Sequence, residues 1–127
     1  MNGFIDDIEK LTKKNDFFRE VLFTGKHCQL VVMSLKSGEE IGKEVHESVD
    51  QFFRIDQGSG EVFIDGEKSE IKDGSAVIVP AGSEHNVVNT GDVDLKLYTI
   101  YSPPNHPKGT IHETYEEAMA AEEEEHK

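Results

Sequence analysis

Glycine spacing is the sequence feature that most constrains the fold of this 127-residue chain. Five glycines follow one another at intervals of eight, eight, eight and nine residues: Gly58, Gly66, Gly74, Gly82 and Gly91. Short runs rich in Val, Ile, Phe and Tyr lie between them or follow them. Evenly spaced short strands joined by glycine turns predict an all-β barrel or sandwich. The Asp-Gly pairs at 65–66 and 73–74 are typical of hairpin turns.

Helical patterns flank this β-rich region. Residues 4–14 predict a short helix, because apolar residues recur at helical spacing and acids precede lysines in the order that suits the helix dipole. Residues 17–23 and 27–35 predict strands rich in Phe, Val and Leu. A second helix is expected over residues 113–121.

The charge balance narrows the range of partners. The chain has 26 acids and 13 bases, a formal net charge of −13. Such a surface repels nucleic-acid phosphates and anionic membranes, so neither is expected as a partner. No repeat or linker divides the chain, so we expect one domain over residues 1–127 with a barrel core over 17–102.

The single cysteine and the N-terminus bear on the compartment. Cys28 has no partner for an internal disulfide, and no apolar targeting segment is found, which favours a cytoplasmic protein. Cys28 leads into an apolar run and is predicted to be a buried, inert thiol.

Polar residues share one face of the predicted strands between residues 38 and 58. Glu44 and His46 are two apart, and side chains two apart on a strand share a face. On the next strand Gln51 shares its face with Phe53 and Ile55, which suit an apolar interior. Polar groups turned into such an interior are costly unless they bind something. A metal ion would satisfy several of them at once.

Two stretches of the chain resemble the two halves of the cupin metal motif. The first reads G-EEIGK-E-V-H-ESVD-Q-FFRIDQ-G over residues 38–58, and the second reads G-SAVIV-P-A-G-SE-H-NVV-N over residues 74–89. The second matches throughout, whereas in the first Glu44 replaces a histidine and Gln51 replaces a glutamate. The chain is similar to the small single-domain bacterial cupins labelled mannose-6-phosphate isomerase-like. The resemblance implies a jelly-roll barrel, or double-stranded β-helix, with short N- and C-terminal helices.

The resemblance also implies four metal ligands: Glu44, His46, Gln51 and His85. Two histidines and one carboxylate are strong donors that suit a divalent Zn, Mn, Fe or Ni ion. Gln51 is open to two interpretations, because it can bind the ion through its amide oxygen or orient Glu44 or a bound water. Glu44 is also a candidate catalytic base. In a metal-free alternative, Glu44 and Gln51 hydrogen-bond to each other and to His46.

Cupins include isomerases, dioxygenases, decarboxylases and sugar-binding proteins, so the fold alone leaves the function open. We expect a metalloenzyme with dioxygenase or isomerase chemistry on a small molecule. The alternative is a non-catalytic module that binds a small ligand or sugar and holds a structural metal. Strand parity turns Lys43 and Arg54 outward, which leaves no inward cation to hold a phosphosugar.

The remaining residues of note are assigned to the surface. Four histidines are interpreted as lying outside the site: His27, His106, His112 and His126. For His106 and His112 the alternative is that the loop brings either of them to the mouth of the barrel. Three apolar residues are expected to point out of the barrel and to form the interface of a homodimer: Ile41, Val45 and Phe52.

Overall fold

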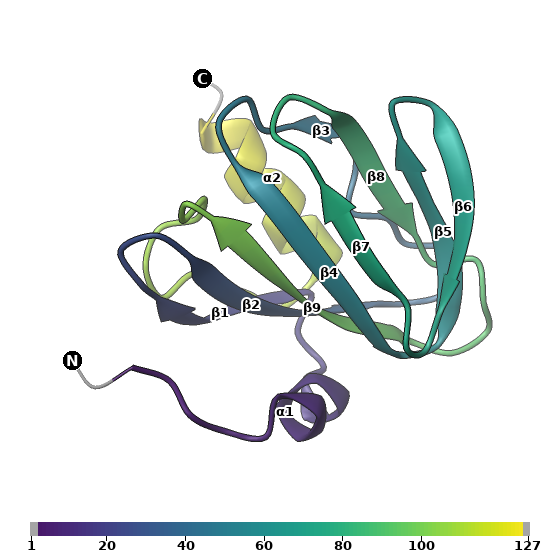
Figure 1. The fold of residues 1–127 in the computed structure, drawn as a ribbon. Coiled ribbons are helices and arrows are strands. Elements are labelled where there is room, and N and C mark those ends of the chain that lie inside the picture. Colours follow the sequence, from purple (N-terminus) through teal and green to yellow (C-terminus); the bar gives the residue numbers. More distant parts are fainter. Residues whose placement is uncertain (1–2, 126–127) are drawn as a thin grey trace.

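The computed structural model describes residues 3–125. These residues form strands that are joined mostly by tight turns, with one helix before them and one after them (Figure 1). The strands are β1 (Arg19–Thr24), β2 (Gln29–Leu35), β3 (Glu44–Val45), β4 (Asp50–Gln57), β5 (Ser59–Ile64), β6 (Glu67–Lys72), β7 (Ala76–Val79), β8 (Glu84–Val88), β9 (Leu95–Ser102) and β10 (Ile111–His112). The helices are α1 (Ile8–Lys14) and α2 (Tyr115–Glu125). His126 lies outside the described residues.

Two antiparallel sheets form the barrel, which confirms the predicted jelly-roll fold. One sheet has the strand order β10-β1-β2-β9-β4-β7, and the other has the order β3-β8-β5-β6. The hydrophobic core takes residues from both sheets, such as Met33 and Leu97 from the first and Val62 and Val87 from the second. Burying these side chains between the sheets supplies the main driving force for folding.

Strand alternation decides which side chains enter the core. On β4, Gln51, Phe53 and Ile55 are all buried, while Arg54 lies on the other face and is 39% exposed. The inward position of Gln51 and the outward position of Arg54 agree with the parity of the sequence. Ile41 is different, because it was expected on the outside but is 3% exposed and belongs to the core. It precedes β3 in a segment without regular strand structure, so alternation does not extend to it.

The regularly spaced glycines occupy turns, as their spacing predicts. Gly58, Gly66, Gly74 and Gly82 all have positive φ angles, between 84° and 93°. Gly66 follows Asp65, which also has a positive φ, and the pair closes the β5–β6 hairpin. At Gly58 a Cβ atom would lie 2.8 Å from the carbonyl oxygen of Asp94, so a side chain is excluded there by contact as well as by conformation.

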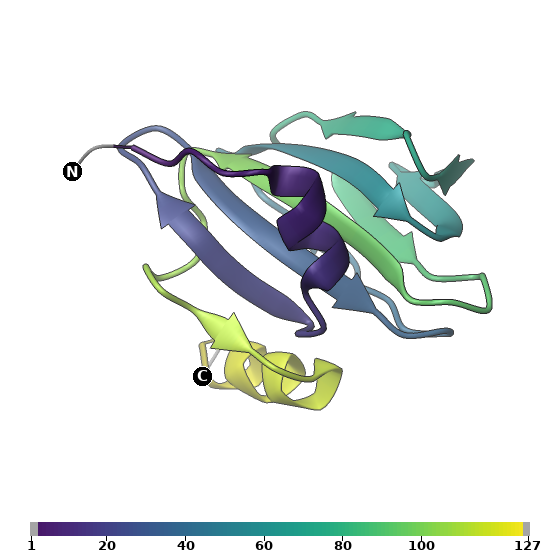
Figure 2. The same ribbon diagram turned by 90° about the horizontal axis from the view of Figure 1, so that it is seen from below.

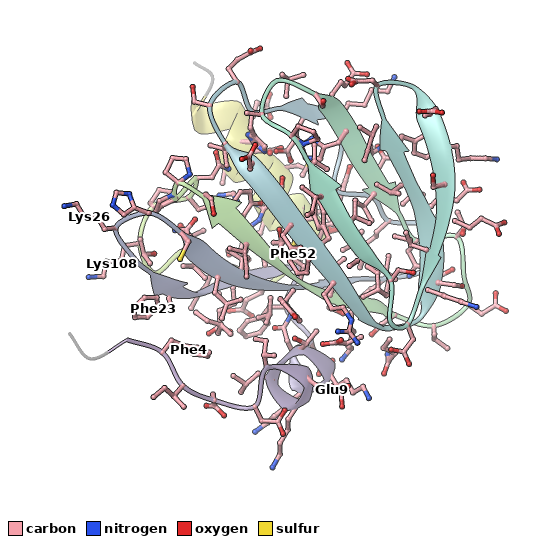
Figure 3. All side chains as sticks on the ribbon, in the orientation of Figure 1. Phe4, Glu9, Phe23, Lys26, Phe52 and Lys108 are labelled. Carbon is pink, nitrogen blue, oxygen red and sulfur yellow. The ribbon has the colours of Figure 1, made fainter. Side chains whose placement is uncertain are left out.

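Helix α1 packs against part of the outer face of the six-stranded sheet, next to β9, β4 and β2 (Figure 2). It begins at Ile8 rather than at residue 4, because the Asp7 side chain accepts a hydrogen bond from the backbone N–H of Lys10 and caps the helix there. Phe4 instead packs near Phe23, with ring centroids 6.2 Å apart (Figure 3). Lys96 ties the sheet to this region by donating to the backbone oxygen of Lys13.

Helix α2 lies on the opposite side of β1 from α1 (Figure 2). Tyr115 packs edge-on against Phe18 with centroids 5.6 Å apart, and Ala118 is fully buried. The helix runs from Tyr115 to Glu125, so it begins later and ends later than the predicted range 113–121. Within residues 3–125, neither helix is long and apolar enough to cross a membrane.

The cysteine prediction is wrong. Cys28 is exposed, because it lies in the turn between β1 and β2 and not in the strand that follows. Its carbonyl oxygen accepts the N–H of Gly25 across this turn. His27 is exposed in the same turn, as expected.

Candidate metal and ligand site

The two halves of the sequence motif are joined by backbone pairing. Strand β3 pairs with β8, and Glu44 lies directly opposite His85 in this ladder. The N–H of Gly82 donates to the carbonyl oxygen of His46, which fixes the turn before β8 against the segment after β3. Residues about forty positions apart in the sequence are therefore held side by side.

Three of the four predicted ligands form a close group. Glu44 Oε2 and His46 Nε2 are 2.9 Å apart, and these two side chains are 18% and 14% exposed. The rings of His46 and His85 have their centroids 5.4 Å apart, and His85 is 2% exposed. The group is thus shielded from bulk water. Charges and donor atoms interact more strongly in such a shielded environment than in water.

Gln51 reaches the same region from β4. Its Nε2 donates to Thr99 Oγ1 at 3.0 Å, but its Oε1 is buried and has no hydrogen-bond partner among the described residues. His46 Nε2 is also buried, and apart from its 2.9 Å contact with Glu44 Oε2 it has no partner among the described residues. The metal-free alternative expects Glu44 and Gln51 to bond to each other and to His46. In this structure Glu44 does contact His46, but Gln51 donates to Thr99.

Electrostatics keep the donor atoms available for a cation. Burial alone would raise the pKa of the Glu44 carboxyl, but its contact with His46 and the nearby Arg19 and His85 outweigh burial and lower that pKa. Burial lowers the pKa of His85, although a hydrogen bond to the Ser83 carbonyl opposes the shift. Glu44 is therefore ionised and His85 neutral near neutral pH, which are the forms that bind metal.

The structure also brings to the site two histidines that the sequence interpretation favoured placing outside it. His106 lies in the loop after β9, and its Nε2 is 3.2 Å from the Tyr101 hydroxyl. Burial and the charge of Arg19 lower the pKa of His106 to about 3, so it is neutral. Burial raises the pKa of Tyr101, which keeps its proton. His112 on β10 faces Arg19, with its Nδ1 3.1 Å from the guanidinium Nη1.

Arg19 is the functional candidate that sequence reasoning missed, and it corrects the expectation that no cation points inward. It is 1% exposed, and the face that it shares with Val21 on β1 is directed into the barrel. The alternation of β1 could have indicated this, because Arg19 and Val21 share the inward face while Glu20 between them is only partly buried. Lys43, in contrast, is exposed as predicted.

A cavity of about 400 Å³ adjoins Glu44, His46 and the two added histidines, while His85 lines a second cavity of about 320 Å³. We call the larger one the mouth cavity; the residues that line it include Arg19, Lys43, Glu44, His46, His106, His112 and Glu122. Glu122 belongs to α2, so this helix closes one side of the cavity. A polar cavity at the end of a barrel is a typical place for a small ligand.

The four predicted ligand side chains have the chemistry of a divalent metal site, although they are not arranged as a complete one. Among residues 3–125, no group of three or more His, Cys, Asp or Glu side chains has metal-ligating geometry. The fit rests on two buried atoms without hydrogen bonds, Gln51 Oε1 and His46 Nε2, next to an ionised Glu44 and a neutral His85. Buried polar atoms of this kind call for a partner, and nitrogen and oxygen donors suit Zn, Mn, Fe or Ni.

Comparisons with known proteins identify the family. Residues 31–101 match the family described as a cupin domain, so the chain belongs to the cupin family. It is 52% identical over 126 residues to the uncharacterized protein YrkC of Bacillus subtilis, covering 94% of this chain and 68% of YrkC. The crystal structure of BH2720 from Bacillus halodurans superimposes with a TM-score of 0.91 at 47% identity, covering 92% of this chain and 93% of BH2720.

One more distant relative carries an enzyme name. The protein named 5-nitrosalicylic acid 1,2-dioxygenase, from Bradyrhizobium, is 38% identical over 80 residues. The match covers 63% of this chain but only 35% of that protein.

Proposed function

We propose that this cupin binds a divalent metal ion through Glu44, His46 and His85, with Gln51 as a fourth ligand or as the group that orients Glu44. The observation that carries the proposal is the pair of buried atoms, Gln51 Oε1 and His46 Nε2, that lack hydrogen bonds beside these donors. Zn, Mn, Fe and Ni are the candidate ions. When bound, such an ion supplies Lewis-acid chemistry, and iron also supports reactions with O₂.

The protein groups around the donors prepare the site for a small substrate. Glu44 stays ionised because His46 and Arg19 lower the pKa of its carboxyl, so it can bind the metal or accept a proton from substrate. His106 is neutral and Tyr101 is protonated, and the His106 ring contacts the Tyr101 hydroxyl. Helix α2 limits water access on one side of the mouth cavity.

The reaction that we favour is of the dioxygenase or isomerase type on a small molecule. The dioxygenase name of the Bradyrhizobium relative supports the first possibility. The test loads metal-free protein with Fe²⁺, Mn²⁺, Ni²⁺ or Zn²⁺ and screens diketones, thiols and aldose sugars, following O₂ uptake and product. Turnover that disappears in the His46→Ala/His85→Ala double variant supports an enzyme. Turnover that persists in that variant contradicts the assigned site.

The alternative is a binding module in which the metal is structural or helps to hold a small ligand. A catalytic ion keeps an open coordination position facing the cavity, whereas a structural ion is enclosed by protein donors. A crystal structure of the metal-loaded protein distinguishes them: water or substrate on the ion supports the enzyme, and a closed sphere with no turnover supports the binding module.

We further infer a homodimer that forms through the outer face of the six-stranded sheet. Phe52 pairs across the strands with Ile78 and Ile100 and lies 6.1 Å from Tyr98 between ring centroids (Figure 3). Ile78 is 67% exposed, so this apolar row is open to a partner. Light scattering at micromolar concentration is expected to give the mass of a dimer, and of a monomer for Ile78→Glu; a wild-type monomer would contradict the inference.

A further inference from the structure

Arg19 carries a buried positive charge at the wall of the mouth cavity. Its side chain is 1% exposed, and it takes part in none of the ion pairs formed by residues 3–125. Its one hydrogen bond goes to His112, and its buried Nε has no partner among the described residues. Removing a charge from water costs several kcal/mol in order of magnitude unless a counter-charge replaces the water, so this position calls for an anion.

The neighbours of Arg19 do not supply that anion. A guanidinium only donates hydrogen bonds, so the Nδ1 atom of His112 that it contacts must be an acceptor and not a protonated nitrogen. Two acids, Glu44 and Glu122, line the same cavity, and Arg19 lowers the pKa of Glu44 through its charge. Glu44 is in contact with His46, however, and no carboxylate of residues 3–125 is in ion-pair contact with Arg19. Beneath the guanidinium, the Phe18 ring lies 5.3 Å from Cζ and offers only its π face.

We propose that Arg19 binds the carboxylate of a small organic acid that occupies the mouth cavity. The guanidinium fork matches a carboxylate in plane and in charge. Because Glu44 and His46 line the same cavity, the opposite end of the acid faces the donor group. This inference deepens the proposed function by naming its substrate class, and it requires the cavity but not the metal.

Charge and space favour a carboxylate over a phosphate. Arg19 offers one buried positive charge, and the other cation of the cavity, Lys43, is exposed at its rim. A phosphate dianion would bring two negative charges next to the acids Glu44 and Glu122, whereas a monocarboxylate brings one, placed against the charge of Arg19. The cavity volume of about 400 Å³ is large enough for a molecule the size of a hydroxy acid or an aromatic acid.

The ligand-side test needs no variant. Metal-free protein is titrated by calorimetry with pyruvate, lactate, benzoate and salicylate, and with the amide of each acid. At least one acid is expected to bind with a Kd below about 10 mM and about 10-fold or more tighter than its amide. The proposal would be overturned if none of the acids binds within this range. It would also be overturned if an acid and its amide bind equally, or if inorganic phosphate binds more tightly than the acids.

The protein-side test compares two cations that line the same cavity. Arg19→Gln is expected to weaken the best acid by about 10- to 100-fold, whereas Lys43→Gln changes it less than about threefold because Lys43 is exposed. Arg19→Lys keeps the charge, so its loss of affinity is expected to lie between those of the two glutamine variants. It keeps the test valid if Arg19→Gln fails to fold. Equal losses in Arg19→Gln and Lys43→Gln, or no loss in either arginine variant, would contradict the assignment. The metal content of these variants, measured separately, is expected to equal that of the wild type. Failure of the metal proposal can therefore be distinguished from failure of the carboxylate proposal.

Discussion

Two cross-strand rows on the same three strands have equal burial and opposite chemistry. Strands β2, β9 and β4 align Gln29, Tyr101 and Gln51 in one row, which we call the polar row. Four residues further into the barrel they align Met33, Leu97 and Ile55, the apolar row. All six side chains are at most 2% exposed. Burial alone therefore does not distinguish the part of the barrel that stabilises the fold from the part that borders the mouth cavity.

The difference lies in how the buried atoms are satisfied. The apolar row gains from being removed from water and has no polar side-chain atoms to satisfy. Within the polar row, Gln29 is saturated: its Nε2 donates to Thr24 and to the His106 carbonyl, and its Oε1 accepts from Asn105 and His106. Gln51 makes one hydrogen bond and leaves Oε1 unpaired. The proposed metal site would give this unpaired atom a partner.

The largest expected effect is on the apolar row. Leu97→Ala removes a fully buried side chain between Met33 and Ile55, and it is expected to lower the free energy of unfolding by about 2–5 kcal/mol. Urea unfolding followed by circular dichroism measures it. A loss below about 1 kcal/mol would contradict the assignment of stability to this row.

The two glutamines of the polar row give a matched pair. Gln29→Leu breaks hydrogen bonds that hold the loop at 105–106, and it is expected to cost about 2–3 kcal/mol. Gln51→Leu loses one bond to Thr99 but removes the unpaired Oε1, and it is expected to cost about 1 kcal/mol or less. The same unfolding assay compares them. Equal costs would mean that Gln51 is as structural as Gln29.

A third change tests whether Gln51 belongs to the metal site. Gln51→Glu replaces an amide oxygen by a carboxylate, and it is expected to tighten divalent metal by about 10-fold if residue 51 contacts the ion, because carboxylates are stronger donors. Competition with a colorimetric chelator measures the affinity. Unchanged or weaker binding would assign Gln51 to the support of Glu44 or of a bound water instead.

The smallest expected effect is a pH dependence at the mouth. The folded-state pKa of His106 is lowered to about 3, so below its usual value near 6.5 the unfolded chain takes up a proton that the folded chain does not. Its contribution to stability is therefore present above pH 6.5 and lost as the pH falls toward 3. Wild type is expected to lose about 1 kcal/mol more than His106→Gln between pH 7 and pH 5. Parallel stability curves for the two proteins would contradict this.

Local sequence patterns predicted the features that depend on the geometry of neighbouring residues. Glycine spacing predicted the turns and the all-β class, and strand parity placed Gln51 inside and Arg54 outside. The spacing of the two-part motif predicted that Glu44 and His85 lie close together, and they pair between β3 and β8. Alternation and turn conformation are properties of neighbouring residues, so one sequence is enough to read them.

The sequence did not predict what depends on distant contacts. His106 and His112 reach the mouth because the chain after β9 returns to pair β10 with β1, and no local pattern indicates that return. Arg19 was missed because its strand lies outside the motif. Ile41 was placed outside by an alternation that the irregular segment before β3 does not follow. Only the assembled sheets show which of these side chains face the same cavity.

The most direct test of the account is the metal content of protein purified without a chelating tag. Elemental analysis after equilibration with Fe²⁺, Mn²⁺, Ni²⁺ or Zn²⁺ is expected to find about one ion per chain in the wild type. The His46→Ala/His85→Ala variant, checked for folding by circular dichroism, is expected to hold none, because it loses two of the three strong donors. A folded double variant that loads metal as fully as the wild type, or a wild type that binds none of the four ions, would contradict the central claim.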